Sequence, residues 1–545
     1  METQDGRPTV AAAIAGRLAR YGTRFVFGYP GGETLDLLEA MRREGIEFVL
    51  TRHEATASFA ALATGELTGR AGVCLATLGP GATNLVSGVA AALLERAPML
   101  AVTAQLPRSR RESTTHQRLD LNALYAPITK GSFRIDPGDA LRTLEKGLRL
   151  AVSGRPGPVH LEMPSDVPRA ECADQIGLDW FGGSEPDKAA PVAPLELLRD
   201  AAGRIAAARR PAMLLGIGAR AAGQPAVTAF AEAAELPVVV APKAKGLLSE
   251  NHPLFGGVIE MLGKQAVVDW LREADLLVYV GFDPVELDML WEFRTPGVLL
   301  DTVPDTDAYY RTDIEVTGDT GANLRALARD PRMDTGARGQ GDGRARAAAL
   351  RDEISRRLEG SANPGLLAPR EAIEAVRAAA SSPRALAATD VGAHKMAAGQ
   401  FWRTAWPGCF LMSNGQSSMG YGLPAAMAAK LLDRERQVVA LIGDGGLGMY
   451  LGELETLARL GLGIPVVVFV DRQLSLIVLG QERRGYPRYG VDFGSPDYRS
   501  LAASLGGHGC VAGSAAQLHS EVAAGFGRDT FTLIAVPVDE RLYRF

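Results

Sequence analysis

The sequence predicts an α/β protein made of three open parallel-sheet domains, and two observations support this prediction. First, short runs rich in Val, Ile and Leu alternate with segments of helical periodicity along most of the chain. Apolar strands separated by helices are typical of parallel sheets that are covered by helices on both faces. Second, two polar, Gly-rich stretches without periodicity interrupt the alternation, at residues 173–194 and 330–349. A chain of 545 residues is also too long for one hydrophobic core, so several domains are expected.

The predicted domains are residues 1–175, 190–332 and 350–545. In the first, strands are expected at "RFVFG", "EFVLT", "GVCLAT", "MLAVTA" and "PVHLEMP", with helices such as "TLDLLEAMRREG" between them. The second has expected strands at "AMLLG", "LPVVVA", "LLVYVG" and "GVLLD", and the third at "RALAAT", "VVALIG", "VVVFV" and "TLIAVPV". The strand pattern therefore predicts one parallel sheet in each domain.

The composition excludes several classes of partner. Hydrophobic residues make up 47% and charged residues 22% of the chain, and the formal net charge is −5. This balance predicts no basic surface for nucleic acid or an anionic membrane. The four cysteines form no CxxC pair, which indicates buried thiols in a reducing compartment rather than structural zinc. The first residues lack the features of a signal peptide, and no uncharged apolar run approaches the roughly 18 residues of a membrane span. The sequence therefore predicts a cytoplasmic protein that binds neither nucleic acid nor membrane.

Two aspartates follow neighbouring strands of the third domain. "ERQVVALIGDGG" is a buried strand that ends at Asp444, and "IPVVVFVD" is the next strand and ends at Asp471. Because a strand-helix-strand unit is right-handed, both aspartates are expected at the same edge of the sheet, where ligands bind. Two carboxylates suit Mg²⁺ or Ca²⁺, and Gly443, Gly445 and Gly446 let backbone N–H groups approach an anion. Alternatively, the two aspartates are a turn or helix-cap residue and an ordinary strand end.

Gly-Asp-Gly, followed 27 residues later by Asp after a strand, resembles the thiamine-diphosphate motif. The resemblance implies that Asp444, Asp471 and the backbone carbonyl of Gln473 hold the Mg²⁺ that binds the diphosphate of the cofactor.

Further segments carry the resemblance over nearly the whole chain. "FGYPGGETLDLL", "TRHEATASFAALATGELTG", "GVCLATLGPGATNLVSGVA" and "HQRLDLNALYAPITK" resemble the pyrimidine-binding domain of the acetolactate synthase group, and "LMSNGQSSMGYGLPAAMAA" resembles the segment before its diphosphate motif. "SNGQ..MG", the "VD" strand end, "GVDFGSPDY" and "GFDPVELDMLW" are most similar to the flavin-independent catabolic acetolactate synthases. The resemblance implies a pyrimidine-binding, a central and a diphosphate-binding domain.

The resemblance also assigns roles to single residues. Glu54, after the strand "EFVLT", corresponds to the glutamate that hydrogen-bonds N1′ of the aminopyrimidine and promotes loss of the C2 proton of the thiazolium. The alternative is a Glu in the first turn of a helix, where the helix dipole favours it. Met419 corresponds to the apolar residue that bends the cofactor, although most lone methionines only fill a core.

His116 and Gln117 correspond to a loop that reaches the reacting carbon from the neighbouring subunit, and together with Glu54 they are the predicted catalytic residues. The alternative for His116 is an exposed loop histidine. Lys130 corresponds to a family lysine with a structural role. The full set of predicted cofactor-binding residues is Pro30, Glu54, Asn84, Gly392, Ala393, His394, Asn414, Gly415, Gln416, Met419, Gly443, Asp444, Gly445, Gly446, Asp471, Gln473, Leu474 and Ser475.

The resemblance implies a decarboxylating carboligase that joins a 2-oxo acid donor, pyruvate, to a second 2-oxo acid or carbonyl acceptor. The alternatives are a 2-oxo acid decarboxylase, a 2-hydroxy ketone lyase that releases an aldehyde, or a non-catalytic subunit. Thiamine diphosphate and Mg²⁺ are the expected cofactors, in a homodimer or homotetramer with sites between subunits. No FAD is expected, because "GFDPVELD" departs from the "G.RFDDR" segment of the flavin-containing branch and the loose GxGxxxG in "LLGIGARAAGQ" is weak evidence for a dinucleotide.

Two departures from the catabolic synthases concern the acceptor. Glu33 stands where those proteins commonly have a lysine, which removes a positive charge that a substrate carboxylate would pair with. Gly480 stands where the family carries a larger side chain near the acceptor. The sequence therefore predicts a small 2-oxo acid donor and an acceptor that differs from pyruvate.

Overall fold

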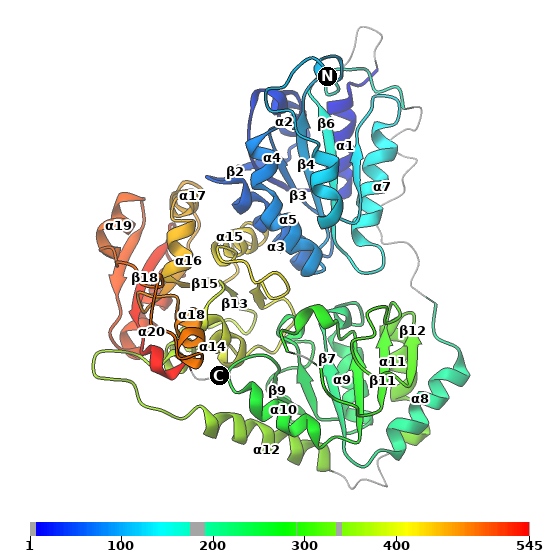
Figure 1. The fold of residues 1–545 in the computed structure, drawn as a ribbon, viewed down its shortest axis with the longest axis vertical. Coiled ribbons are helices and arrows are strands. Elements are labelled where there is room, and N and C mark those ends of the chain that lie inside the picture. Colours follow the sequence, from blue (N-terminus) through cyan, green and yellow to red (C-terminus); the bar gives the residue numbers. More distant parts are fainter. Residues whose placement is uncertain (1–6, 175–190, 290, 334–340, 544–545) are drawn as a thin grey trace. The chain divides into compact units, whose positions relative to one another are not determined.

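The computed structural model describes residues 7–174, 191–289, 291–333 and 341–543. It contains three six-stranded sheets, each wholly parallel and flanked by helices (Figure 1). The predicted fold class is therefore confirmed. Of the described residues, 7–174, 416–433 and 450–460 form a first compact unit, and the others form a second.

The first unit contains the sheet of order β2-β1-β3-β4-β6-β5. Its strands and helices are β1 (Phe25–Tyr29), β2 (Glu47–Leu50), β3 (Gly72–Ala76), β4 (Met99–Gln105), β5 (Ser132–Arg134), β6 (Pro158–Pro164), α1 (Val10–Tyr21), α2 (Leu35–Arg43), α3 (Glu54–Thr68), α4 (Pro80–Asn84), α5 (Val86–Leu94), α6 (Leu121–Tyr125), α7 (Ala140–Val152), α15 (Gly422–Leu432) and α17 (Glu453–Arg459).

The second unit contains the other two sheets, of orders β12-β11-β10-β7-β8-β9 and β14-β13-β15-β16-β18-β17. The first of these comprises β7 (Pro211–Leu215), β8 (Val238–Val240), β9 (Phe255–Val258), β10 (Leu276–Val280), β11 (Gly297–Asp301) and β12 (Ile314–Thr317), with α8 (Leu195–Ala207), α9 (Gln224–Ala233), α10 (Lys264–Arg272), α11 (Thr320–Ala328) and α12 (Asp342–Arg357). The second comprises β13 (Leu386–Thr389), β14 (Phe410–Met412), β15 (Val438–Gly443), β16 (Pro465–Val470), β17 (His508–Val511) and β18 (Thr532–Pro537), with α13 (Pro369–Ala379), α14 (Ala393–Phe401), α16 (Asp444–Met449), α18 (Ser475–Arg483), α19 (Tyr498–Ser504) and α20 (Ala515–Gly525).

The expected strands all form, and their apolar composition explains why. β3, β4 and β6 of the first sheet are buried along their whole length, as both-face burial of a central parallel strand requires. Five strands were missed by the sequence analysis: β5, β9, β12, β14 and β17, of three or four residues each. All five lie at sheet edges, where pairing with one neighbour demands only a short and weakly apolar segment.

The segment between β15 and β16 differs from the single crossover helix that the sequence predicts. It forms two helices, α16 and α17, separated by residues 450–452. α17 and α15 belong to the first unit although their sequence lies in the third predicted domain, and α15 packs against α3. Aromatic contacts secure this packing, since the ring of Phe59 on α3 lies edge-on to the rings of Tyr421 and Tyr450.

The strand orders place possible ligand sites. Counted within its own sheet, the order is 2-1-3-4-6-5 for the first and third sheets and 3-2-1-4-5-6, reversed, for the central one. Ligands of such sheets bind beyond the carboxyl ends of the strands where the chain order reverses. These points lie between β1 and β3 in the first sheet, between β13 and β15 in the third, and between β7 and β10 in the central one.

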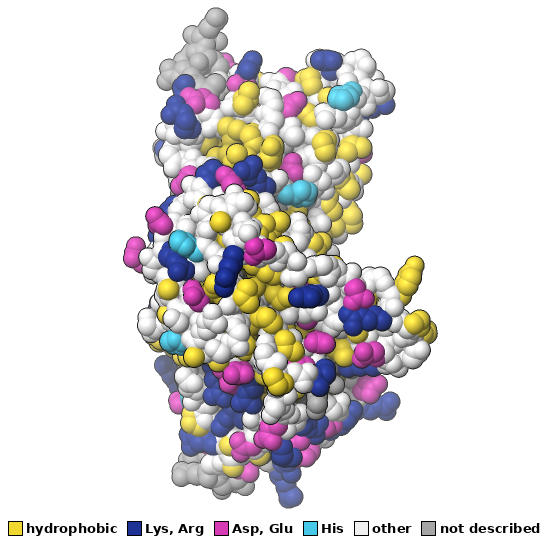
Figure 2. All heavy atoms as spheres, turned by 90° about the vertical axis from the view of Figure 1, so that its left-hand side faces the viewer, with side chains coloured by type: hydrophobic (Ala, Val, Ile, Leu, Met, Phe, Trp, Pro, Cys, Tyr) yellow, Lys and Arg dark blue, Asp and Glu magenta, His cyan; other side chains and the backbone are white. Residues whose placement is uncertain are grey.

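On the face shown in Figure 2, acidic side chains are interspersed among the basic ones. Within the described ranges, no helix has the length and apolar character needed to cross a lipid bilayer.

Candidate functional site

Asp444 and Asp471 lie at the carboxyl ends of adjacent parallel strands. β15 and β16 pair with Gly443 opposite Phe469, so the two aspartates that follow occupy the same edge of the sheet. Asp444 is the first residue of α16, and its Oδ2 accepts a hydrogen bond of 2.8 Å from the backbone amide of Arg472. Its Oδ1 accepts one of 2.9 Å from the amide of Gly445. The loop after β16 is thus bound to the start of α16.

The carboxylate of Asp471 is held by the turn that follows it. Its Oδ2 accepts a hydrogen bond of 2.5 Å from the hydroxyl of Ser475, and its Oδ1 accepts one of 3.3 Å from the amide of Gln473. Burial raises the pKa of Asp471 to about 6, the Ser475 hydroxyl opposes this, and the charge of Asp444 adds to it. Burial also raises the pKa of Asp444, against the hydrogen bonds from backbone amides. Two mutually repelling carboxylates at one sheet edge match the donor set of a divalent cation.

Gln473, Leu474 and Ser475 form the turn between β16 and α18. The amide of Leu474 donates to the carbonyl of Val491 at 2.9 Å, and the Gln473 side chain donates to the Ser475 hydroxyl at 3.0 Å. The "GVDF" segment thereby pairs with the turn, and the amide of Phe493 also donates to the carbonyl of Arg472 at 3.1 Å.

The ring of His394 packs against the backbone of Gly392 and Gly443. A Cβ at either glycine would lie 3.0 to 3.2 Å from ring atoms of His394, so neither position accepts a side chain without displacing the ring. His394 follows Ala393 at the start of α14 and stacks on Phe469 with ring centroids 5.4 Å apart. Burial, with the neighbouring charge of Lys395, lowers the pKa of His394 to about 3, so the imidazole is neutral. Its Nε2 is buried and makes no hydrogen bond to the described residues, although buried polar atoms normally have a partner.

Asp390 is a residue of this site that the sequence analysis missed. It follows β13, at the same edge as Asp444, and is fully buried. A Cβ on Gly446 would lie 1.9 Å from its Oδ2, so this carboxylate requires glycine at position 446. The signal was present, because Asp390 begins the "DVGAH" segment at a third strand end.

The described residues supply only part of a metal coordination sphere. No three His, Cys, Asp or Glu side chains converge on a common point within the described ranges. A cation at Asp444 and Asp471 therefore takes its other ligands from backbone carbonyls, water or a bound anion.

Glu54 lies at the corresponding edge of the sheet of the first unit. It is the first residue of α3, whose N-cap is His53, with the ring nitrogen Nδ1 accepting from the amide of Ala55 at 3.0 Å. Glu54 is half-buried, and its Oε2 accepts a hydrogen bond of 2.9 Å from the Nδ2 of Asn84 on α4. Its Oε1 lies 3.3 Å from the position that a Cβ on Gly81 would occupy. The structure thus brings Glu54 and Asn84 together and leaves only glycine room beside them.

Pro30 and Glu33 follow β1, next to Glu54 at the same edge. Oε2 of Glu33 accepts a hydrogen bond of 2.7 Å from the hydroxyl of Thr77, which follows β3. The methyl group of Thr77 lies 2.9 Å from the Cβ position of Gly81, the residue beside Glu54. Thr77 therefore stands between two carboxylates, at the point where the strand order reverses.

The loop with His116 and Gln117 is exposed within the chain. Gln117 has a φ of +55°, and its side chain packs against Gly79, which precedes α4. Lys130 instead donates to the carbonyl of Ser153 and packs along Gly157. Burial, with the charge of Arg96, lowers the pKa of Lys130 to about 8. The Lys130 contacts are those of a structural residue.

The "SNGQSSMG" segment is divided between the units. Asn414 donates from Nδ2 to the carbonyl of Glu286 at 2.8 Å within the second unit, where Gly415 also lies. In the first unit the amide of Gln416 donates to Glu95 at 3.4 Å, and Met419 is half-buried. The predicted site residues therefore form two groups. Pro30, Glu54, Asn84, His116, Gln117, Gln416 and Met419 belong to the first unit, and the others belong to the second.

In the Gly-rich loop after β7 of the central sheet, the backbone amides of residues 216–219 already donate hydrogen bonds within the protein. The amides of Gly216, Gly218 and Ala219 donate to the carbonyls of Val280, Gly281 and Gly216, at 2.8 to 3.1 Å. The amide of Ile217 donates to Oε2 of Glu286 at 2.7 Å, and Glu286 is buried. Burial raises the pKa of Glu286 to about 8.

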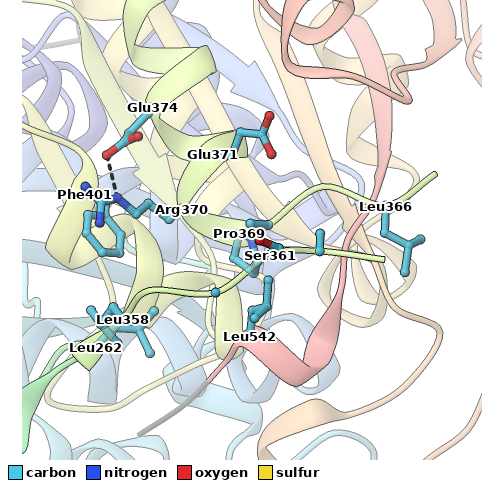
Figure 3. A pocket seen from close by; sticks show the side chains of 13 residues that line it. Leu262, Leu358, Ser361, Leu366, Pro369, Arg370, Glu371, Glu374, Phe401 and Leu542 are labelled. Atoms are coloured by element: carbon cyan, nitrogen blue, oxygen red, sulfur yellow. Dashed lines mark hydrogen bonds and ion pairs between the residues drawn. The ribbon is translucent and has the colours of Figure 1, made fainter. Parts of the chain in front are cut away.

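A separate cavity of about 370 Å³ lies elsewhere in the second unit (Figure 3). Leu358, Phe401 and Leu542 contribute apolar walls, and Arg370 pairs with Glu374 at 2.9 Å. The Arg370 guanidinium also lies over the ring of Phe401. None of the predicted site residues lines this cavity.

Comparison with known proteins identifies the family and the fold. Residues 8–124, 198–327 and 390–536 match the models of the N-terminal TPP binding domain, the central domain and the C-terminal TPP binding domain of thiamine pyrophosphate enzymes. The first and third ranges contain Glu54 and both aspartates.

Three curated relatives align over almost the whole chain. The acetolactate synthase large subunit of Parasynechococcus marenigrum (strain WH8102) is 34% identical over 554 residues, which cover 97% of this chain and 87% of the relative. The catabolic acetolactate synthase of Raoultella terrigena is 30% identical and covers 97% and 95%. The acetolactate synthase isozyme 2 large subunit of Escherichia coli (strain K12) is 31% identical and covers 96% and 94%. The chain therefore belongs to the thiamine pyrophosphate enzymes, in the acetolactate synthase group.

Proposed function

We propose that the protein is a thiamine diphosphate-dependent decarboxylating carboligase that joins a 2-oxo acid donor, pyruvate, to a second 2-oxo acid or carbonyl acceptor. The main observation behind the proposal is that two sheet edges each present carboxylates held in place by hydrogen bonds. One presents Asp444 and Asp471 bound into a common turn, and the other presents Glu54 bound to Asn84. A diphosphate with its cation and an aminopyrimidine need these two kinds of edge.

The second unit fits a diphosphate with Mg²⁺. Asp444, Asp471 and the carbonyl of Gln473 would hold the cation, because Mg²⁺ prefers oxygen ligands and normally completes its octahedron with phosphate oxygens and water. Gly443, Gly445 and Gly446 would let the backbone come close to the phosphates, and Ser475 would keep Asp471 in place through its hydrogen bond. Neutral His394, with its free Nε2, and the adjoining Gly392 and Ala393 would line the same edge.

The first unit fits the aminopyrimidine. Glu54 would hold a proton against N1′ of the ring, and Asn84 would orient the carboxylate through its hydrogen bond. When bound, the cofactor supplies a thiazolium that stabilises the carbanion left by decarboxylation. Pro30, Asn414, Gly415, Gln416, Met419 and Leu474 would shape the surrounding walls. His116 and Gln117, exposed in the single chain, would complete the site of a neighbouring subunit.

A homodimer or homotetramer with sites between subunits follows from this assignment. The two groups of site residues belong to different units of the chain, and the loop that would approach the reacting carbon is exposed. An assembly in which one subunit supplies the Glu54 edge and another the aspartate edge accounts for both observations.

The central domain would bind no FAD. A dinucleotide in this strand order places its diphosphate on free amides of the Gly-rich loop. Here the amides from Gly216 to Ala219 donate to backbone carbonyls and to Glu286. Glu286 belongs to the "GFDPVELD" segment, which differs from the corresponding segment of the flavin-containing branch. Its carboxylate would occupy the amide of Ile217 that the diphosphate of a dinucleotide would otherwise use.

Glu33 and Gly480 support an acceptor other than pyruvate. The Glu33 carboxylate, bound to Thr77 beside Glu54, would repel an anionic acceptor. A Cβ at Gly480 on α18 would meet only an Nη1 atom of Arg484, at 3.4 Å, so this helix face leaves room for a larger acceptor. Glu33→Lys and Gly480→Trp are expected to shift acceptor preference towards pyruvate. Clean acetolactate formation from pyruvate, with no product from any aldehyde, would contradict this part of the proposal.

Product analysis tests the reaction. Purified protein with thiamine diphosphate and Mg²⁺, and without flavin, is given ¹³C-labelled pyruvate, and the products are followed by NMR. Acetolactate, or a 2-hydroxy ketone formed with an added aldehyde, supports the carboligase. Acetaldehyde alone, absent in a Glu54→Gln control, would instead identify a decarboxylase.

A further inference from the structure

A polar network, buried at its centre, lies among β4, β5, β6 and α6 in the unit that contains Glu54. Its centre is His160 on β6, which is fully buried. Nε2 of His160 lies 2.8 Å from the hydroxyl of Thr103 on β4, and Nδ1 lies 2.7 Å from the hydroxyl of Ser132 on β5. Burial lowers the pKa of His160 to about 3, so the ring is neutral and carries one N–H.

The hydroxyl of Ser132 decides which nitrogen of His160 carries the proton. Ser132 donates to Oδ1 of Asn122 at 2.8 Å, so it can only accept from the histidine. Nδ1 of His160 is therefore protonated, and Nε2 accepts from Thr103. Asn122 in turn donates to the buried carboxylate of Glu162 at 3.0 Å. The ring is fixed on both sides by hydrogen bonds that leave it one orientation.

Tyr125 connects this ring to the catalytic edge. Its ring stacks on that of His160, with centroids 4.0 Å apart and an angle of 9° between the planes. Its hydroxyl donates a hydrogen bond of 2.5 Å to the backbone carbonyl of Ala82. Tyr125 is fully buried, so no water competes for that carbonyl.

Ala82 lies in α4, the helix that carries Asn84. α4 has five residues, from Pro80 to Asn84, and is too short to hold its place by its own hydrogen bonds. Gly79, with a φ of +63°, precedes it, and its carbonyl accepts the amide of Thr83 at 3.1 Å. The hydroxyl of Tyr125 therefore anchors the segment from which Asn84 reaches Glu54 at 2.9 Å.

We propose that Tyr125 is a positioning residue for Glu54, acting through Ala82 and Asn84, with His160 as the platform that holds the tyrosine ring. The inference rests on the proposed role of Glu54 and names a residue 71 positions away in the sequence that sets its orientation. Loss of the tyrosine hydroxyl leaves the fold of the sheet in place and lets α4 shift, so the carboxylate is held less firmly against N1′.

Hydrogen exchange of the protein without cofactor tests the anchoring step. In Tyr125→Phe, amides of residues 81–84 are expected to exchange faster, measured by mass spectrometry on peptides that cover α4. Tyr21→Phe is the matched control, because the buried Tyr21 hydroxyl in the same unit accepts a hydrogen bond of 2.9 Å from the Ala71 amide and is bonded to no residue of α4. Equal exchange of α4 in Tyr125→Phe and wild type would overturn the proposal.

The rate of C2 hydrogen–deuterium exchange of bound thiamine diphosphate tests the catalytic consequence. Tyr125→Phe is expected to slow it roughly three- to tenfold, the size of one lost net hydrogen bond, with cofactor affinity changed much less. Tyr21→Phe is expected to match wild type, and His160→Gln, which removes the platform, is expected to slow the exchange even if Tyr125→Phe fails to fold.

Glu54→Gln separates this inference from the proposed function. If C2 exchange of the bound cofactor is slow in Glu54→Gln but proceeds at the wild-type rate in both Tyr125→Phe and His160→Gln, the positioning role alone is refuted. If C2 exchange proceeds at the wild-type rate in Glu54→Gln, both the proposed role of Glu54 and this inference are refuted.

Discussion

The backbone amide of Arg472 donates a hydrogen bond of 2.8 Å to the carboxylate of Asp444, 28 residues earlier in the chain. This bond joins the end of β15 to the loop after β16, beside Asp471. Because the two strand ends are locked together in the protein alone, the cation site needs little rearrangement to form.

Replacement of the two aspartates is expected to have unequal effects. Asp444→Ala removes a carboxylate that both binds the cation and holds the Arg472 amide, so Mg²⁺-dependent activity should be lost. Asp471→Asn keeps an oxygen ligand and relieves the repulsion by Asp444, so Mg²⁺ affinity should fall but activity should return at high Mg²⁺. Mg²⁺ titration at saturating thiamine diphosphate measures both. Equal losses in the two variants would contradict the added role of the Asp444–Arg472 hydrogen bond, and unchanged Mg²⁺ dependence in both would contradict the proposed ligand set.

Two glycines of α16 make a matched pair. A methyl group at Gly446 would lie 1.9 Å from the buried Asp390 carboxylate, whereas one at Gly448 has nothing within 4 Å. Gly446→Ala should destabilise the protein by roughly 1–3 kcal/mol through overpacking and should weaken cofactor binding. Gly448→Ala should be neutral or stabilise the helix by up to about 1 kcal/mol. Thermal unfolding and cofactor titration check the pair, and similar behaviour of the two variants would show that Asp390 moves aside.

The ion pair of Lys245 and Glu250 is buried in the second unit. Its atoms lie 2.7 Å apart, and each side chain is only 1% exposed. Glu250→Gln leaves an ammonium buried without its counter-charge and should cost about 3–5 kcal/mol. The double variant Lys245→Met with Glu250→Leu removes both charges and should recover most of that loss. Denaturant unfolding measures the difference, and a double variant as unstable as Glu250→Gln would count against the charge argument.

Acidification should destabilise the first unit through His160. The pKa of His160 is about 3 in the folded protein, below the ordinary 6.5. Between pH 6.5 and pH 3, His160 is therefore protonated in the unfolded chain but neutral in the folded protein. Stability is therefore lost as the pH falls below 6.5, by about 1.4 kcal/mol at pH 5.5 from this residue. The midpoint of thermal unfolding should drop roughly 4 °C on that account between pH 7.5 and 5.5.

His160→Gln is the informative variant for this pH effect, with the exposed His508→Asn as control. His160→Gln should be less stable at pH 7.5 but should lose less stability on acidification than wild type. His508→Asn should follow the wild-type profile. Parallel pH profiles of wild type and His160→Gln would show that this ring does not govern the acid limb.

The central strands and the two aspartates were predictable because their signals are local. Apolar runs of five to seven residues are stable only between covering helices, and right-handed crossovers place consecutive strand ends at one edge. The Gly-rich loop after β7 shows the limit of such signals. Its pattern suggests a phosphate site, yet the Ile217 amide is occupied by Glu286, 69 residues later.

By itself, the sequence determined the three parallel sheets, the family, and the positions of Glu54, Asp444 and Asp471 at strand ends. Only the tertiary structure decided that Asp390 lies under Gly446, that α15 and α17 join the first unit, and that Tyr125 anchors the helix of Asn84. The physical reason is the range of the interactions. Strand periodicity and turn chemistry act over a few residues, whereas these contacts join segments tens to hundreds of residues apart and exist only after the sheets have packed.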